Sequence, residues 1–430
     1  MKAGYSYLII CLFSAVTAVW AQPATDTLTI SREQAETIFL QRNLKLLATK
    51  LEIDEAKAQV IQAKLWPNPS LAIEEVNLWS NHGAEELGRL FGSWGNHAQA
   101  SVDIEQVIQT AGKRRILMAV EEAGVRIAEQ QFEDVLRSLK VELRSQLADL
   151  DLAQQREYTY QGALAQLRRL LQAYRRQMEN GNVSRSEYMR LRASEAELVK
   201  AIAGIRKDSR EAQQALKVLL GIAPECELVF KGTQSHDLAL DAAKTLHAAA
   251  ILEWTDTYNA ELQALRWEVT QAEHKLRYER AQRTPDVAVS VGYDRGGNIM
   301  RDFIGLGVSM DIPFFDRNQG NIKATQAALE RNRLLAQEKA VEVGSAAIRV
   351  WKDLLITISQ REHFGPDDET EMERLLEGYH RSFAERRVSL LEYLDFLEAY
   401  LDTKDYLLET NRDIYVQYEN LRYYVGDQLP

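Results

Sequence analysis

Long stretches of the chain place apolar residues at alternating steps of four and three. The clearest stretch contains Tyr160, Leu164, Leu167, Leu171, Tyr174 and Met178, which is the heptad spacing of a coiled-coil seam. After a turn at residues 180–182 the spacing resumes from Tyr188 to Leu219, with polar Glu195 and Ser209 in two gaps. No proline interrupts residues 70–223, and residues 113–179 alone would span roughly 100 Å as a helix. The pattern predicts a helical hairpin over residues 112–220, far longer than a compact globular domain requires.

Two other regions alternate apolar and polar residues one by one, as strands do. In the first, Ala98, Ala100, Val102 and Ile104 share one face, which predicts strands at about residues 70–79 and 97–105. The second region predicts strands at about residues 286–294 and 303–312, on either side of a Gly-Gly-Asn loop. Small or polar residues occupy the opposite faces. Such hairpins suit a barrel wall between lipid and a watery lumen, but half-buried hairpins of a soluble protein look similar, so the strands alone leave both interpretations open.

The two halves of the chain repeat each other. At an offset of 216 (285 minus 69), the matching pairs are Leu46 and Leu262, Ala48 and Ala264, Glu52 and Glu268, Ile53 and Val269, Ala56 and Ala272, and Pro69 and Pro285. At an offset of 208 (320 minus 112), Asp103, Ile104 and Gly112 match Asp311, Ile312 and Gly320. At an offset of 205 (379 minus 174), Tyr174, Val183, Ser184, Glu187 and Tyr188 match Tyr379, Val388, Ser389, Glu392 and Tyr393.

These matches predict two units of the order helix, strand, strand, long helix, helix. The first covers residues 22–223, a linker follows at 224–244, and the second covers residues 245–430 with its helical hairpin at 320–425. One chain would then contribute four strands, whereas the smallest transmembrane barrels need about eight. The free edges must therefore be paired by other copies of the chain.

The N-terminus has the layout of a secretory signal. Lys2 precedes an apolar run over residues 8–20, which is too short to span a bilayer. We predict a signal peptide over residues 1–21 and a mature start at Gln22. Cys226 is then the one cysteine of the mature chain, so neither an intramolecular disulfide nor a thiolate metal cluster is expected.

Hydropathy and charge narrow the function classes further. Mean hydropathy is -0.33, and after Trp20 no apolar stretch approaches the length of a membrane-spanning helix, so any entry into a membrane would use strands. The net charge of -11 argues against a nucleic-acid partner, because neutralising phosphates requires a basic face. It is compatible with the passage of cationic cargo.

The duplicated plan and two short segments resemble the TolC family of outer-membrane efflux proteins. The segments are Gly112-Lys113-Arg114-Arg115 and the run from Ile312 to Asn321, both similar to the cation-efflux branch of CzcC-like and CusC-like components. The resemblance implies a mainly α fold with a β-barrel contribution: a homotrimer with a 12-stranded transmembrane β-barrel in the cell outer membrane and a long periplasmic α-helical barrel.

The same resemblance implies a function and partners. The protein would be the passive outer-membrane conduit of a tripartite efflux system, working with a periplasmic adaptor (membrane fusion) protein and an inner-membrane resistance-nodulation-division pump. The branch favours heavy-metal cations as cargo, and a multidrug system is the alternative. A periplasmic adaptor is less consistent with two hairpins in duplicate halves, and a structural coiled-coil protein leaves the strands unexplained.

Three acidic residues are expected to form a periplasmic gate. The resemblance assigns this role to Glu187, Glu392 and Asp395, which follow the two tight turns. Three copies of each carboxylate would ring an aperture, attract cations and repel one another. Alternatively, these carboxylates simply stabilise helix N-termini through the helix dipole.

The turns themselves resemble the tips that meet the adaptor in the family. The expected contact residues are Gly181, Asn182, Val183, Ser184, Arg387, Val388 and Ser389. The two serines could equally be plain N-caps. Gly181 suits a positive-φ turn position, and because Arg386 takes its place in the second unit, the second tip is expected to turn differently.

The places where strand gives way to helix carry the remaining candidate residues. They are Gly112, Lys113, Arg114, Pro313, Phe315, Asp316, Arg317, Asn318 and Gly320. The basic cluster of residues 113–115 is expected either to face lipid head groups or the lumen wall, or to be a solvated helix start. Pro313 is expected to remove one ladder hydrogen bond and to mark the bend from strand to helix.

No residue pattern indicates catalysis or a bound cofactor. The seven histidines show no pairing at metal-ligand spacing, so a metal site is not expected. A nucleophile elbow, a phosphate loop and paired catalytic motifs are absent from the sequence. We therefore expect a protein that is not an enzyme and that needs no cofactor.

Overall fold

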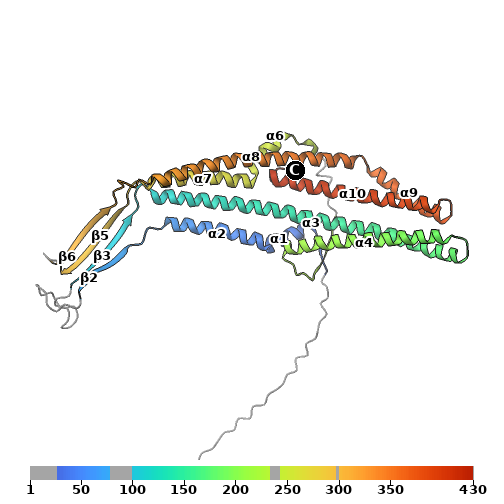
Figure 1. Cartoon of the computed structure of the whole chain (residues 1–430), viewed down its shortest axis with the longest axis horizontal. Coiled ribbons are helices and arrows are strands. Elements are labelled where there is room, and N and C mark those ends of the chain that lie inside the picture. Colours follow the sequence, from blue (N-terminus) through green and yellow to red (C-terminus); the bar gives the residue numbers. More distant parts are fainter. Residues whose placement is uncertain (1–26, 78–98, 233–242, 297–299, 430) are drawn as a thin grey trace, which may run out of the picture.

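Figure 1 shows the computed structural model of the chain, which describes residues 27–77, 99–232, 243–296 and 300–429. An elongated layer of helices leads into a four-stranded sheet at one end. The predicted signal peptide, residues 78–79 and 97–98 of the first predicted hairpin, loop residues 297–298 and residues 233–242 of the predicted linker lie outside the described residues.

Helices make up most of the described chain, so the mainly α fold predicted from the heptads is confirmed. In the first half they are α1 (Arg32–Arg42), α2 (Leu44–Lys64), α3 (Lys113–Glu179) and α4 (Arg185–Leu220). In the second half they are α6 (Ala248–Tyr258), α7 (Ala260–Ala281), α8 (Gln319–Glu362), α9 (Pro366–Ala384) and α10 (Leu390–Val425). Among the helices described, none is both long enough and apolar enough to cross a membrane.

The helices lie side by side in the same lateral order along the molecule. Near the sheet the order is α2, α3, α7, α8, and towards the far end it is α4, α3, α10 and then α8 continued by α9 (Figure 1). The heptad positions explain this packing, because Leu167, Leu191 and Tyr393 are fully buried in one core shared by α3, α4, α9 and α10. The first half of the chain therefore forms one lateral edge, and the second half forms the other.

Asparagine N-caps divide two helix pairs at equivalent places. Asn43 and Asn259, 216 residues apart, separate α1 from α2 and α6 from α7, and their side chains accept hydrogen bonds from Leu46 N and Leu262 N at 2.9 Å each. An asparagine oxygen at this position satisfies a backbone N–H that the helix itself leaves free. The result in each half is a bend between the short helix and the longer one.

The larger sheet has the strand order β2, β3, β5, β6 and is open in a single chain. Its strands are β2 (Ser70–Asn77), β3 (Gln99–Ile108), β5 (Val287–Gly296) and β6 (Arg301–Met310), and all its pairings are antiparallel. β1 (Thr27–Ile30) and β4 (Glu227–Phe230) form a separate parallel pair at the waist of the molecule. The observed β6 ends at Met310, two residues before the expected end at 312.

The offset of 208 between the halves is wrong for the strands. Asp103 and Ile104 lie inside β3 and pair with β5, whereas Asp311 and Ile312 follow the last residue of β6. The N-caps of the two long helices are Gly112 and Asn318, which differ by 206. Gly320, expected to match Gly112, is the second residue of α8, because the connection from β6 to α8 is longer than the one from β3 to α3.

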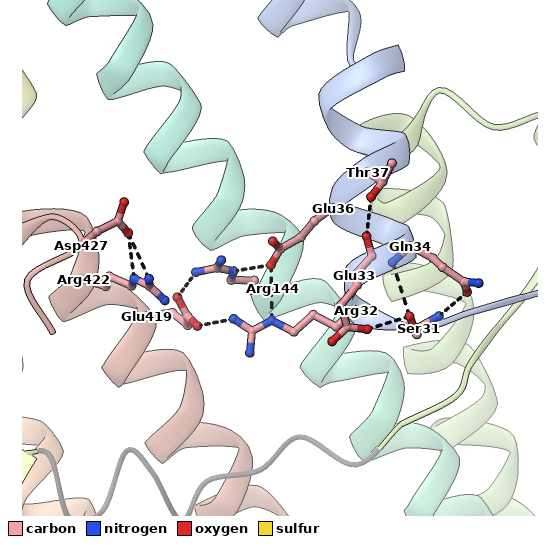
Figure 2. A network of polar contacts seen from close by, with 10 residues as sticks. All are labelled: Ser31, Arg32, Glu33, Gln34, Glu36, Thr37, Arg144, Glu419, Arg422 and Asp427. Atoms are coloured by element: carbon pink, nitrogen blue, oxygen red, sulfur yellow. Dashed lines mark hydrogen bonds and ion pairs between the residues drawn. The ribbon is translucent and has the colours of Figure 1, made fainter. Parts of the chain in front are cut away.

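A buried ion network joins three helices at the waist (Figure 2). Arg144 of α3 donates to Glu36 of α1 at 2.9 Å and to Glu419 of α10, which is only 2% exposed. Arg32 of α1 bridges the same two carboxylates at 3.3 and 3.0 Å. Charge-assisted hydrogen bonds of this kind offset the desolvation free energy of buried ions only when every partner is present. The network therefore fixes α1 and α10 against α3, and heptad spacing did not predict it.

Candidate functional site

One face of the four-stranded sheet is apolar and uncovered. The register aligns Leu71, Ile104, Val291 and Leu306 in one cross-strand row, and Ile73, Val102, Tyr293 and Ile304 in the next. Further rows contain Val289 with Val308 and Val287 with Met310. Leu306 is 82% exposed, and the neighbouring apolar side chains are also largely exposed. A water-facing sheet rarely presents such a continuous apolar surface, which marks this face as an interaction site.

The other face of the sheet carries small and polar residues. Asp103 pairs with Gly292, and Ser290 pairs with Gly307. A Cβ atom on Gly292 would lie 2.2 Å from the carboxylate of Asp103, and one on Gly307 would lie 2.4 Å from the hydroxyl of Ser290. The glycines therefore leave room for polar side chains on this face, so the two faces suit lipid on one side and water on the other.

Both outer strands of the sheet, β2 and β6, have one unpaired side in the described chain. Their free backbone N–H and C=O groups require partners, and these groups cost several kcal/mol each if left in hydrocarbon. The two edges therefore demand further strands from outside the described chain.

At the first strand-to-helix junction, Gly112 has a φ of 68° and serves as the N-cap of α3. Lys113 is only 3% exposed, and its Nζ lies 2.8 Å from Oδ1 of Asp286. The same carboxylate oxygen accepts a hydrogen bond from the backbone N of Thr110 at 2.9 Å. Both expectations for Lys113, a side chain facing head groups or lumen and a solvated helix start, are wrong. An acid distant in sequence, Asp286, pairs with this buried lysine and ties the start of β5 to the start of α3.

The other two basic residues of this junction lie differently. The guanidinium of Arg114 stacks over the ring of Trp66 at 4.0 Å from the ring centroid and donates to the carbonyl of Lys64 at 3.3 Å. Arg115 is exposed. Arg114 thus holds the end of α2 against α3, and only Arg115 is free to face the surroundings.

The second junction is built around Asn318. Asn318 is the N-cap of α8 and has a φ of 58°. Its backbone N donates a hydrogen bond to the side chain of Asp316 at 2.8 Å, and its side-chain amide donates to the carboxylate of Glu279 of α7 at 2.6 Å. Asn tolerates the left-handed region better than most residues, so it replaces the glycine of the first junction. Pro313 lies beyond β6, within the bend from strand to helix. The expectation that it removes one ladder hydrogen bond is therefore wrong, whereas its place at the bend is as expected. Phe315 and Arg317 are exposed beside this bend.

The two tips make the same turn. In the first, Gly181 N donates to Met178 O at 3.0 Å and Asn182 N donates to Gln177 O at 2.9 Å. In the second, the corresponding bonds are Arg386 N to Phe383 O at 3.0 Å and Arg387 N to Ser382 O at 2.8 Å. Both are Schellman turns.

The expectation of a different second turn is therefore wrong. Arg386 takes a φ of 60°, close to the 77° of Gly181. Its guanidinium donates to the side chain of Gln177 at 3.0 Å, a bond between the two tips that offsets part of the backbone cost.

Capping boxes hold two of the three expected gate carboxylates. Glu187 accepts from the backbone N of Ser184 at 3.1 Å, and Glu392 accepts from the backbone N of Ser389 at 2.8 Å. Hydrogen bonds from the Ser389 backbone and hydroxyl lower the pKa of Glu392, so this carboxylate stays ionised. Asp395 is exposed one turn further along α10. In the described part of the chain, no hydrogen bond joins Glu187 to Glu392 or Asp395.

The expected contact residues lie at the outer surface of the turns. Gly181, Asn182 and Arg387 are exposed, while Val183 and Val388 are half-buried. Ser184 and Ser389 are N-caps, as the alternative interpretation held, and this leaves a contact role open. The two tips present equivalent surfaces at the same end of the molecule (Figure 1).

A stack of aromatic rings beneath the tips was not anticipated. Tyr174 of α3 stacks on Phe383 of α9 with 5.4 Å between centroids, and Phe383 stacks on Tyr393 of α10 at 4.7 Å. The hydroxyl of Tyr393 hydrogen-bonds Nδ1 of His380 at 3.1 Å. The stack joins the first hairpin to the second. Tyr174, Tyr379 and Tyr393 were visible as matching residues, but their mutual contacts depend on how the two hairpins pack.

Among the described residues, no three His, Cys, Asp or Glu side chains are grouped closely enough to hold a metal ion.

Comparison with known proteins gives a consistent set of relatives. Residues 38–222 match the family described as Outer membrane efflux protein. The chain is 24% identical over 395 residues to the cobalt-zinc-cadmium resistance protein CzcC of Cupriavidus metallidurans, covering 90% of this chain and 86% of that protein. It is 23% identical to the nickel-cobalt-cadmium resistance protein NccC of Alcaligenes xylosoxydans, covering 73% of this chain and 70% of that protein. The fold is similar to that of solved CusC, with a TM-score of 0.69, 18% identity, and coverage of 92% and 91% of the two chains.

Proposed function

We propose that three copies of this chain form the outer-membrane channel of a tripartite efflux system, because residues 38–222 match the outer membrane efflux protein family. In this proposal the sheets build a barrel in the outer membrane, and the helices build a tunnel in the periplasm. The channel is a passive conduit and not an enzyme.

The uncovered apolar face of the sheet carries this proposal. Its cross-strand rows, such as Leu71, Ile104, Val291 and Leu306, present apolar side chains on every strand, while the opposite face is small and polar. Lipid would cover the first face, and water in the lumen would wet the second. The unpaired edges of β2 and β6 supply the reason for assembly. Three copies of four strands give 12, an even number within the range of known barrels.

The tunnel would need partners at its periplasmic end. The tips around Gly181, Asn182, Val183 and Ser184 and around Arg387, Val388 and Ser389 are where a periplasmic adaptor would dock, and a resistance-nodulation-division pump would supply the cargo. Identical Schellman turns at both tips support this, because they offer an adaptor six equivalent sites in a trimer. A water-filled bore lets hydrated ions pass without the desolvation cost of a hydrocarbon path.

We propose heavy-metal cations as the cargo. The relatives CzcC and NccC are named for resistance to cobalt, zinc, cadmium and nickel. The net charge of -11 favours passage of cations over anions. A multidrug channel is the alternative, since the cargo is selected by the pump.

Glu187, Glu392 and Asp395 are proposed to line the periplasmic aperture. The two glutamates are held at fixed positions by their capping boxes, and Asp395 is exposed on the same end of α10. Carboxylates of three copies brought together would attract cations and repel one another. The capping role of the two glutamates is compatible with a gate role, since the Ser184 and Ser389 bonds use one oxygen of each carboxylate and leave the other for the lumen.

Deletion of the gene, with tolerance measured across a panel of metal salts and drugs, tests the function and the cargo together. We expect sensitivity to divalent metals, restored by the wild-type gene. Sensitivity to drugs alone would overturn the metal assignment. A purified mature protein that is monomeric and soluble without detergent would overturn the channel itself.

A further inference from the structure

His380 lies near the end of α9, where it contacts the first turns of α10 below the second tip. Its Nδ1 is 3.1 Å from the hydroxyl oxygen of Tyr393, and the two rings are 5.3 Å apart between centroids. Tyr393 is fully buried in the core shared by α3, α4, α9 and α10, whereas His380 is half-buried. This pair therefore joins the end of one helix to the start of the next.

The hydrogen bond between the two side chains requires a neutral imidazole. Burial raises the pKa of Tyr393, so its hydroxyl keeps its proton and needs an acceptor. Among the described residues, the partner of this hydroxyl is Nδ1 of His380. Nδ1 accepts when the ring proton is on Nε2, but an imidazolium carries protons on both nitrogens and accepts at neither. Protonation of His380 would thus leave a buried donor without an acceptor.

The surroundings of His380 keep it neutral. Its burial is the largest influence and lowers its pKa, and the guanidinium of Arg169 on α3 lowers it further. Glu377, on α9 itself, acts in the opposite direction and does not outweigh them, and α10 faces the ring with the uncharged hydroxyl of Tyr393. Because folding depresses this pKa, neutral His380 stabilises the contact above about pH 6.5, and that stabilisation is lost as pH falls through the folded pKa.

Tyr393 links this contact to the proposed aperture. Its ring stacks on Phe383 at 4.7 Å, and Phe383 stacks on Tyr174 of α3 at 5.4 Å. In α10 it stands between Glu392 and Asp395, two of the carboxylates proposed to line the aperture. A change at the Tyr393 hydroxyl therefore acts on the packing of the second hairpin against α3 and on the position of both acids.

We propose that His380 is a proton-operated latch, which holds the aperture closed while it is neutral and releases it when it is protonated. The added proton turns Nδ1 from an acceptor into a donor and places a second positive charge near Arg169. Both effects oppose the contact between α9 and α10. Glu392, whose pKa is lowered by its capping bonds, keeps its charge in the same pH range. The proposal rests on the channel proposed above and names a signal that regulates it, the acidity of the periplasm.

Planar bilayers that contain the full-length mature chain test the latch. Between about pH 7.5 and about pH 5.5 the wild-type single-channel conductance should rise at least about twofold, whereas that of His380→Gln should stay at its starting value. Glutamine offers the Tyr393 hydroxyl an acceptor and does not titrate. His363→Gln is the matched control, because His363 is exposed at the end of α8, and it should respond to pH as the wild type does.

Arg169→Gln tests the charge beside the latch. Removal of this guanidinium favours protonation of His380, so the midpoint of the conductance response should move to higher pH. A histidine that only fills space would leave the midpoint unchanged. Arg168→Gln removes an equal charge from the neighbouring residue, which pairs with Glu195 of α4, and should leave the midpoint where it is in the wild type.

Amide hydrogen exchange separates the latch from the channel. In detergent, exchange of α9, corrected for the intrinsic effect of pH, should be faster at about pH 5.5 than at about pH 7.5 in the wild type and equal at both in His380→Gln. If the wild type forms channels whose conductance and exchange do not change with pH, or if His380→Gln responds equally, the latch is overturned. If the wild type forms no channel while its exchange responds, the proposed channel fails, although the pH-sensitive contact stands.

Discussion

Arg144 shows how much of the architecture can depend on one side chain. Its guanidinium lies between Glu36 and Glu419, two carboxylates on helices that are far apart in sequence (Figure 2). Burial alone would lower the pKa of Arg144, but the charges of Glu419 and Glu36 outweigh burial and raise it, so the arginine remains ionised. Without it, the buried carboxylate of Glu419 would keep Arg32 as its one ion-pair partner among the described residues.

We predict that Arg144→Met lowers the free energy of unfolding by up to about 3–5 kcal/mol, because it removes one of the two arginines that pair with the buried Glu419. Chemical denaturation in detergent, followed by circular dichroism, measures the change. Arg422→Met is the matched control, since Arg422 pairs with Asp427, which is 86% exposed, and the loss should be below about 1 kcal/mol. Equal effects of the two substitutions would contradict the role given to the network.

The same network predicts a dependence of stability on pH through Glu36. Burial would raise the pKa of Glu36, but its bonds to Arg144 and Arg32 prevail and lower it below 4.5. A carboxyl whose pKa is depressed by folding contributes stability above its unfolded pKa and loses it as pH falls through the folded pKa. Acidification below about pH 4.5 should therefore lower the unfolding midpoint, and Glu36→Gln should flatten that decline. A variant as acid-sensitive as the wild type would exclude Glu36 as a cause.

The tips allow a test of backbone strain at single glycines. Gly181 has a φ of 77°, while Gly204 lies inside α4, and a Cβ added to it would meet no atom of a neighbouring element within 4 Å. Gly181→Ala should destabilise by about 1 kcal/mol, because a Cβ is strained in the left-handed region. Gly204→Ala should stabilise by up to about 1 kcal/mol, because alanine favours a helix interior. Thermal unfolding of both variants checks the opposite signs, and a shared sign would contradict the turn geometry.

At the scale of elements, periodicity predicted what local spacing can determine. The heptads of residues 160–178 mark a helix, and the alternation from Val102 to Ile104 marks a strand, because side-chain direction follows the backbone period. The register of 208 between the halves failed, since matching an Asp-Ile pair ignores the longer connection from β6 to α8. Lys113 and Arg144 were also beyond local patterns, because Asp286 and Glu419 meet them only after the chain has folded.

The apolar face of the sheet gives the element-scale prediction. Leu306→Arg places a charge on that face, whereas Ser309→Arg places the same charge on the polar face. If lipid covers the apolar face, Leu306→Arg should cost about 2–4 kcal/mol near the bilayer midplane, and Ser309→Arg should be tolerated. The amount of folded oligomer in isolated outer membranes measures the difference. Equal yields would show that lipid does not contact this face.

At the scale of the whole molecule, the assembly would bring the acids of the tips into one ring. Glu392 and Asp395 occupy the first turns of α10, and three copies would contribute six carboxylates to one aperture. Because a capping box accepts glutamine as well as glutamate, Glu392→Gln removes the charge and keeps the helix start intact. The effect of removing the charge of Glu392 can therefore be measured without disturbing the start of α10.

We predict that Glu392→Gln with Asp395→Asn reduces the cation preference and changes the single-channel conductance in planar bilayers, most strongly at low salt, where the carboxylates are least screened. The reversal potential in a salt gradient measures the preference directly. Glu371→Gln, which neutralises an exposed acid of α9 away from the turn, should leave the reversal potential near that of the wild type. If the double variant conducts with unchanged preference, neither acid lines the aperture, Glu392 serves only in its capping box, and the aperture lies elsewhere along the tunnel.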